Sequence, residues 1–156
     1  MKNQYGFTLV EGLIVIVIIF ILGGMLFAAA EPTAEIMDER DAVRRSEVVA
    51  ILNAVLKYHS DYGVLPAGLD KDASKVQVLG TSATGCSLNC GATTATDTCL
   101  DLGADLVGGQ YLDEIPIDPA FGSVLNTDYY INVNSGGHII VGACDPENVK
   151  AISVTR

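Results

Sequence analysis

The feature that most constrains this chain is a long apolar run near its start that carries a single acidic residue. Within residues 7–30 the only charged side chain is Glu11, and residues 12–30 alone are about as long as a helix that crosses a bilayer. An ionised carboxylate in hydrocarbon costs roughly 2.5 to 3.5 kcal/mol on insertion scales, so such a residue usually faces a partner. The nearest basic residue, Lys2, lies outside the run. Glu11 therefore needs a cation that the intact chain does not place beside it.

Proteolysis after Gly6 would create that cation, because it frees the amine of Phe7 at the start of the helix that carries Glu11. The amine of one copy could then pair with Glu11 of a neighbour. A short polar leader ending in glycine, followed by Phe-Thr-Leu-Val-Glu and an apolar helix, resembles the class III signal of type IV pilins and type II secretion pseudopilins. The resemblance implies cleavage between Gly6 and Phe7, N-methylation of Phe7, and assembly through Glu11. It also implies a prepilin peptidase/methyltransferase, an inner-membrane assembly platform and other pilin subunits as partners.

Two other interpretations of this segment stay open. Residues 28–30 are alanines and resemble the cleavage site of a secretory signal peptide, although the apolar core of such a peptide is only about 7 to 15 residues long. The second interpretation is that the segment is a plain membrane anchor that is not processed. Lys2 before the run and the acidic residues within 31–39 after it favour a leader in the cytoplasm. We therefore expect an inner-membrane protein with its globular part outside the cytoplasm, which then enters a filament.

Length and charge limit what the rest of the chain can be. The 156 residues leave room for one modest globular domain beside the apolar run. The formal charge of -10 disfavours nonspecific binding to nucleic acid, so membrane lipid is an expected partner and nucleic acid is not. We expect four segments: a leader at 1–6, a transmembrane and filament-core helix at 7–30, an amphipathic helix half at 31–62, and a globular loop and sheet domain at 63–156.

A second helix is predicted directly after the apolar run. From Thr33 to Tyr62 the apolar residues recur at spacings of three and four, as in an amphipathic helix. Joined to residues 7–30, this segment would form a long helical spine with weak points at Gly23-Gly24 and Pro32. Two interpretations of these weak points stay open: this part of the helix unwinds during assembly, or it forms a static kink.

The main basic cluster of the chain lies on this second helix. Arg40, Arg44 and Arg45 alternate with acidic residues, and Asp41 precedes Arg45 by the favourable spacing of four. Such runs are mostly solvated helix faces, which is our expectation here. The alternative is that Arg44 and Arg45 pair with acids of neighbouring subunits. On either interpretation, reversing both charges would leave the monomer folded.

After the helix the pattern changes to that of loops and short strands. Gly63 and Pro66 end the helix. Residues 67–99 are rich in Gly, Ser, Thr and Asp and predict a variable surface loop, with a possible short strand at 76–79. Residues 100–112 predict a short helix or a turn.

The last part of the chain predicts a small antiparallel sheet. Residues 129–133 and 138–144 are apolar, aromatic and β-branched, and Asn134-Ser135-Gly136-Gly137 between them predicts a hairpin turn. Residues 151–154 could add a third strand. One face of such a sheet has to be buried, and the amphipathic helix offers the apolar stripe to cover it. The predicted fold is therefore α+β, with a long N-terminal helix spine packed against a small antiparallel sheet.

A proline-rich connector precedes this sheet. Residues 115–119 cannot form a central strand, because Pro116 and Pro119 lack the donor that a ladder requires. A similar Pro-x-Asp-Pro segment joins the variable loop to the sheet in major pseudopilins and related pilins. Pro116, Asp118 and Pro119 thus extend the resemblance, which implies a type IV pilin-like fold.

The four cysteines predict disulfide bonds. Cys86, Cys90, Cys99 and Cys144 all follow the apolar run, and an even number in an exported domain of this size suggests two bridges. Three pairings are possible, and we favour Cys99 with Cys144 and Cys86 with Cys90. A zinc site is the chemical rival, although three residues separate Cys86 from Cys90 where a zinc knuckle usually has two. We expect no cofactor.

The chain lacks the sequence marks of an enzyme. His59 and His138 have no nucleophile motif or phosphate loop near them, so both are expected to be structural. Calcium is conceivable but has no diagnostic loop among the dispersed acids, which are Asp70, Asp72, Asp97, Asp101, Asp105, Asp113 and Asp118. The chain is therefore expected to be a structural subunit of a type IV pilus or a type II secretion-like pseudopilus. An outward-facing, membrane-anchored binding domain that does not polymerise is the alternative.

Overall fold

The computed structural model describes most of the chain as two compact units, Met1–Ile36 and Met37–Arg156. The residues that the structure describes are 8–30, 32–74, 76–86, 90 and 98–156, with the side chains of residues 26–30, 32 and 33 excepted. The leader residues and the predicted cleavage point between Gly6 and Phe7 lie outside them.

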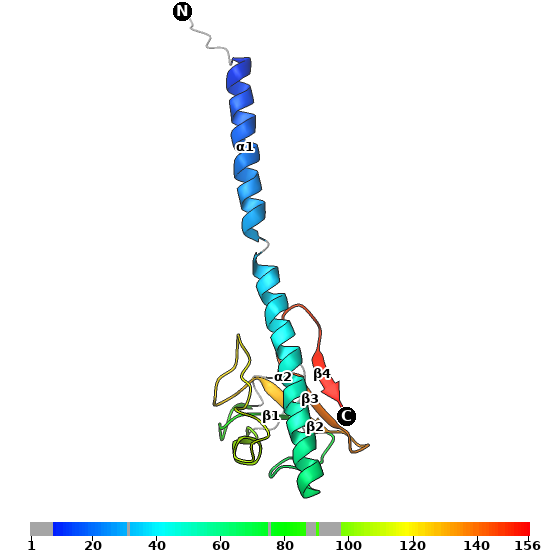
Figure 1. Cartoon of the computed structure of the whole chain (residues 1–156). Coiled ribbons are helices and arrows are strands. Elements are labelled where there is room, and N and C mark those ends of the chain that lie inside the picture. Colours follow the sequence, from blue (N-terminus) through cyan, green and yellow to red (C-terminus); the bar gives the residue numbers. More distant parts are fainter. Residues whose placement is uncertain (1–7, 31, 75, 87–89, 91–97) are drawn as a thin grey trace, which may run out of the picture. The chain divides into compact units, whose positions relative to one another are not determined.

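The first unit contains helix α1, Leu9–Ala30 (Figure 1). Thr8 caps its N-terminus, because the backbone N–H of Glu11 donates to Thr8 Oγ1 at 3.2 Å and that of Gly12 donates to the Thr8 carbonyl at 3.2 Å. A threonine cap with glutamate three residues later is the sequence pattern of a capping box, and an acidic residue in the first turn suits the helix dipole. The helix continues through Gly23-Gly24, the first of the two weak points expected from the sequence.

Within the described part of the chain, no helix combines the length and the hydropathy of a membrane crossing. The transmembrane role of residues 7–30 stays a prediction.

Helix α2, Pro32–Tyr62, is the second helix that the sequence predicts. Proline suits the first helical position, because the N–H that it lacks would have no partner within the helix there. Gly63 ends the helix with a φ of 71°, and its N–H donates to the His59 carbonyl at 2.8 Å. Glycine adopts this left-handed conformation without a Cβ clash, so α2 stops where the sequence predicts.

The second unit contains a four-stranded antiparallel sheet with the strands in sequence order, β1-β2-β3-β4 (Figure 1). The predicted hairpin and the predicted third strand are confirmed. The short strand expected at 76–79 is present as β1, at one edge of the sheet. Asn134 shapes the turn between β2 and β3, since its Oδ1 accepts the N–H groups of Gly136 and His138. The strands are β1 Gln77–Val78, β2 Tyr129–Val133, β3 Ile139–Ala143 and β4 Ile152–Thr155.

The core of this unit lies between α2 and the sheet. Val48, Ile51 and Val55 of α2 are fully buried and share one apolar cluster with Ile131 of β2 and Val141 of β3. The predicted α+β class and pilin-like packing of a helix on a small antiparallel sheet are confirmed.

Residues 100–112 form less helix than the sequence allows. The structure has one π-helical turn, Gly103–Val107, and buries Leu102 and Leu106 in the core. The glycines at both ends keep the helix short, since glycine is a weak helix former.

Candidate functional site

The first candidate site is the N-terminal turn of α1. Glu11 is exposed there, and it is the only charged residue of the helix. Its backbone N–H donates to the Thr8 cap, and its side chain is exposed. The acid is therefore available to a partner at the end of the helix where the dipole is positive.

The second component of this site is the apolar surface of α1. Every large apolar side chain from Leu9 to Met25 is more than two-fifths exposed, and residues 13–22 are exposed without interruption. Ten consecutive residues cover all sides of an α-helix, so no face is reserved for water. A helix that is apolar all round is stable when lipid or other helices surround it.

A buried ion cluster in the second unit is the other site with unusual chemistry. Arg44 of α2 is fully buried, and its Nε and Nη2 donate to the two carboxylate oxygens of Asp118 at 2.5 and 2.9 Å. Its Nη1 donates to Asp41 and to Glu147, both at 2.8 Å. Bidentate arginine–carboxylate pairs are among the strongest hydrogen-bonded contacts in proteins. One guanidinium thus ties α2 to the proline-rich connector and to the loop between β3 and β4.

The acids of this cluster have further donors. Asp118 also accepts the backbone N–H groups of Ala120 and Phe121, at 2.8 and 3.0 Å. Burial by itself raises the pKa of Asp118, but the hydrogen bonds from Arg44 and from these amides outweigh it and hold the pKa below its ordinary value.

The same balance between burial and hydrogen bonding sets the pKa values of Asp41 and Glu147, the other two acids that Arg44 contacts. Asp41 accepts the N–H groups of Glu147 and Asn148 at 3.0 and 2.9 Å, and Arg40 donates twice to Glu147 at 2.7 and 2.6 Å. Burial raises the pKa of both carboxyls, yet their hydrogen bonds keep it lowered. The cluster is ionised at neutral pH, and its charges are paired within the chain.

This arrangement corrects the prediction for the arginines. Neither a solvated face nor pairing with neighbouring subunits holds for Arg44, and Asp41 pairs with Arg44 at a spacing of three where the sequence suggested Arg45. Reversing the charge of Arg44 would bury an unpaired glutamate among acids, so we now expect this reversal to destabilise the monomer. The signal was present in the sequence, because Asp41 and Arg44 continue the apolar stripe of Val48 and Ile51 toward the helix start.

The disulfide pairing is the second correction. Cys86 bonds to Cys99 and Cys90 bonds to Cys144, with Cα–Cα distances of 5.3 and 4.5 Å. The pairing favoured from the sequence, Cys99 with Cys144 and Cys86 with Cys90, is wrong. No thiol remains free to bind zinc.

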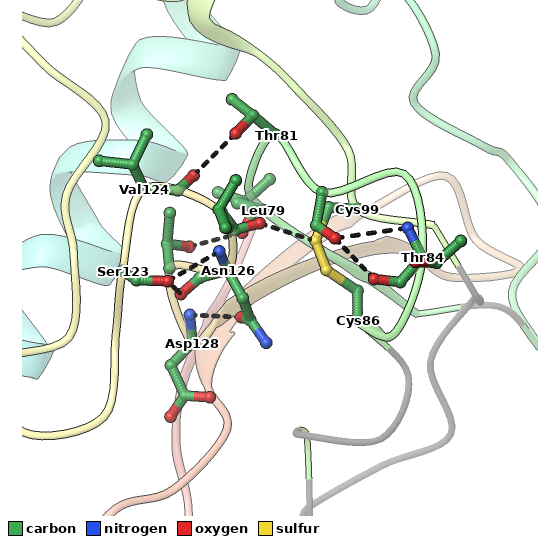
Figure 2. Close-up of a disulfide and its surroundings, with 12 residues drawn as sticks. Leu79, Thr81, Thr84, Cys86, Cys99, Ser123, Val124, Asn126 and Asp128 are labelled. Atoms are coloured by element: carbon green, nitrogen blue, oxygen red, sulfur yellow. Dashed lines mark hydrogen bonds between the residues drawn. A yellow bond between two sulfur atoms is a disulfide. The ribbon is translucent and has the colours of Figure 1, made fainter.

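Backbone pairing explains why Cys99 meets Cys86 (Figure 2). The chain after β1 runs beside residues 98–100, since the Cys99 N–H donates to the Ser82 carbonyl at 3.1 Å and the Leu100 N–H donates to the Val78 carbonyl at 2.8 Å. These contacts join residues about 20 positions apart along the sequence, which the spacing of the cysteines does not reveal.

A buried carboxyl group that the sequence did not single out precedes β2. Asp128 is 2% exposed, has a φ of 67°, and its Oδ2 has no hydrogen-bond partner. Its backbone N–H donates to Asn126 Oδ1 at 3.0 Å (Figure 2). Burial, with Asp145 and Asp118 nearby, raises the pKa of Asp128 to about 7.

The remaining predicted ligands are dispersed. Asp101 accepts the N–H of Gly103 and Asp105 accepts that of Ala67, so both stabilise turns, and Asp97 lies outside the described residues. Over the described ranges, no group of three or more potential metal ligands gathers. His59 and His138 lie on the second unit, far in sequence from Glu11, and both are exposed.

Comparison with known proteins now bears on the first site. Residues 1–27 match the prokaryotic N-terminal methylation motif, which includes Gly6, Phe7 and Glu11. The chain carries a class III prepilin signal. Searches of curated proteins and of solved structures returned no match. The resemblance inferred from the sequence is confirmed over these residues, and the prepilin signal implies processing by a prepilin peptidase and assembly into filaments of pilin subunits.

We predict that replacing Arg44 destabilises the globular unit of this chain. Arg44→Ala should lower the free energy of unfolding by about 3 to 5 kcal/mol, because removing one partner leaves buried charges uncompensated. Urea unfolding of the full chain in detergent measures this change. Arg45→Ala, at an exposed neighbour on the same helix, should change it by less than about 0.5 kcal/mol. Equal stability of the two variants would contradict the structural role of Arg44.

We predict a pH effect from Asp128. Its raised pKa means that the folded state holds a proton which the unfolded state has lost, so this stabilising contribution is complete below about pH 4 and is lost as the pH rises to about 7. The slope is at most about 1.4 kcal/mol per pH unit.

Asp128→Asn should remove this slope and raise the stability at pH 7.5, because asparagine tolerates the left-handed backbone and carries no charge. Thermal unfolding between pH 4.5 and pH 7.5 compares the variant with Asp113→Asn, at an exposed acid. If Asp128→Asn and Asp113→Asn follow the wild-type pH profile alike, Asp128 does not titrate in this range.

Proposed function

We propose that this chain is a prepilin, a structural subunit of a type IV pilus or a type II secretion-like pseudopilus. In this proposal residues 1–6 are a leader removed after Gly6, Phe7 becomes N-methylated, and the mature chain polymerises through α1. The observation that carries the proposal is the match of residues 1–27 to the methylation motif. That match includes the bond to be cut, the new N-terminus and the acid.

Maturation would supply the cation that Glu11 lacks. Hydrolysis of the Gly6–Phe7 bond leaves an amine on Phe7, and N-methylation keeps that amine basic. The Thr8 cap supports this role, because it starts α1 directly after Phe7 and so places the new amine at the positive end of the helix. A carboxylate at that end is favourable, and Glu11 of an adjoining copy would supply it. The pairing fixes the axial register of two neighbouring helices.

The apolar surface of α1 supports assembly as the purpose of this pairing. Side chains on all sides of the helix are exposed within the single chain, from Leu9 at 88% to Met25 at 67%. We propose that lipid of the inner membrane covers them before assembly and that neighbouring α1 helices cover them afterwards. Moving α1 from the membrane into the filament then exposes little apolar surface to water, since its surroundings are apolar in both places.

The globular unit suits a subunit that works outside the cytoplasm. Its two disulfides require an oxidising compartment, which agrees with the expected outward orientation. The prepilin peptidase/methyltransferase and an inner-membrane assembly platform are the proposed partners on the membrane side. The long-range bridges and the Arg44 cluster would let this unit keep its shape while the helix changes surroundings.

We predict that Glu11 is dispensable for processing and required for assembly. Glu11→Ala should be cleaved and methylated normally but should reduce incorporation more than tenfold, because losing one partner of a buried ion pair costs about 2 to 5 kcal/mol. Mass spectrometry of the membrane-extracted chain reports processing, and electron microscopy of sheared fractions reports filaments. Glu35→Ala, at an exposed acid of α2, is the control and should assemble. Wild-type amounts of filament from Glu11→Ala would refute the pairing.

The N-terminus of the mature chain tests the proposal as a whole. We expect a chain that starts with N-methylated Phe7, in sheared fractions that contain fibres. A mature chain that retains Met1, or one that begins at Glu31, would contradict prepilin maturation. Long surface fibres would indicate a pilus and short envelope-spanning ones a pseudopilus. A processed protein without fibres would favour an anchored binding domain.

A further inference from the structure

The globular unit has two exposed apolar surfaces that neither maturation nor the Arg44 cluster uses. The first, the apolar tip, consists of Phe121, Val124 and Leu125 in the loop before β2. The second, the basic groove, lies between the end of α2 and the hairpin of β2 and β3 and has a volume of about 470 Å³. The charged residues beside the two surfaces are of opposite sign.

The apolar tip is exposed although its backbone is fixed. Phe121, Val124 and Leu125 are 59%, 65% and 61% exposed. The carbonyls of Val124 and Leu125 accept the N–H groups of Thr81 and Ser82 at 3.2 and 3.0 Å. The Val124 carbonyl also accepts the Thr81 hydroxyl at 3.3 Å (Figure 2). A loop held in place with its large apolar side chains turned to water is typical of a surface prepared for a partner.

The Arg44 cluster fixes the other end of the same loop. The Asp118 carboxylate accepts the Phe121 N–H, and the Arg44 guanidinium carbon lies 5.9 Å from the centre of the Phe121 ring. One face of this ring therefore packs within the chain while more than half of the side chain remains exposed. The conformation of the tip is determined by the core of the unit.

The surroundings of the tip are acidic. A groove of about 350 Å³ adjoins it, and Val124 shares the lining of this groove with Ile117, Asp101 and Glu114. No basic residue is present among the described residues of that lining. A partner of the tip would therefore meet apolar atoms flanked by negative charge.

The basic groove has the opposite character. Four basic side chains from separate segments converge on it: His59 of α2, Lys71, His138 and Arg156. Between them the lining is apolar and includes Val133. None of the described lining residues is acidic, in a chain whose formal charge is -10. The acidic overall composition of the chain does not predict such a concentration of basic groups.

The geometry of the basic groove is also fixed by the sheet. Arg156 exchanges backbone hydrogen bonds with Ile139, of 2.6 and 2.9 Å, and the His138 N–H donates to the side chain of Asn134 at 3.0 Å. The groove thus exists in the free chain, and an occupant would not need to order it.

The two surfaces lie on different sides of the second unit. Figure 1 shows the yellow loop before β2 on one side of α2, and the orange hairpin with the C-terminal end of β4 on the other. Two different surfaces that bind one another give a head-to-tail contact between copies, which builds an open helical assembly wherever its rotation does not close into a ring.

We propose that the apolar tip of one copy docks into the basic groove of the next copy. The apolar side chains of the tip fill the groove, and the acids beside it, Glu114 foremost, face the basic residues at the rim, among them Lys71. This inference rests on the proposed filament and adds a contact between globular units to the one made by α1. Opposite charges at the rim set the register of the contact, and the apolar tip supplies most of the buried area.

A charge swap tests this contact. Lys71→Glu and Glu114→Lys should each lower the amount of sheared filament at least about fivefold at 0.15 M salt, since each places like charges opposite one another. The double variant restores opposite charges at every contact and should regain most of the wild-type amount. Lys150→Glu changes the net charge as Lys71→Glu does, at an exposed residue outside the groove, and should assemble normally. Failure of the swap to restore assembly, or normal filaments from Lys71→Glu, would overturn the proposal.

Crosslinking tests the proximity directly. Val64, at the rim of the groove, and Leu125 are both exposed, and the native cysteines are already bonded. In assembled filaments, Val64→Cys with Leu125→Cys should give a ladder of covalent oligomers with a short bismaleimide, whereas either single variant should not. Absence of the ladder in intact filaments would exclude the contact.

The readouts separate this inference from the proposed function. All groove and tip variants should be cleaved after Gly6, methylated on Phe7 and as stable to heat as the wild type. If the wild type itself forms no fibres, the prepilin proposal fails. If it forms fibres that the swap variants leave unchanged, only the contact between globular units fails.

Discussion

The ion pair between Arg44 and Asp118 is the contact on which the globular unit depends. Taking a guanidinium fully out of water is unfavourable by several kcal/mol unless its donors are satisfied, and here three carboxylates surround it. Each of those carboxylates is held in turn by backbone amides or by Arg40. The pair therefore positions three segments at once, and it also fixes the loop that presents Phe121. An apolar core alone would hold α2 on the sheet without specifying where the connector lies.

Glu11, in the first turn of α1, has two separate roles. The backbone of Glu11 takes part in the Thr8 cap, while its side chain remains available outside the helix. The cap and the partner therefore do not compete for the same atoms.

Sequence reasoning was sufficient wherever the signal is local. Periodicity located α2 over nearly its full length, turn residues located the hairpin, and a short motif located the processing signal. It failed where distant segments meet. The partner of Arg44 is 74 residues away, the two disulfides depend on how the chain returns past β1, and the raised pKa of Asp128 depends on burial by several loops. The helix stripe did contain Arg44, and a basic residue in register with Val48 and Ile51 is a signal that an acid elsewhere must be buried beside it.

The order of the strands bears on how the globular unit reaches its fold. β2, β3 and β4 pair with their neighbours along the chain, and such local hairpins form early because little loop entropy is lost. The pairing of β1 with β2 instead closes a loop of about 50 residues. The Cys90–Cys144 bridge spans a similar separation of 54 residues, and it closes the chain around that same loop. The Cys90–Cys144 bridge thus holds covalently the part of the fold whose backbone pairing is least local, whereas β2, β3 and β4 form by pairing of neighbouring strands.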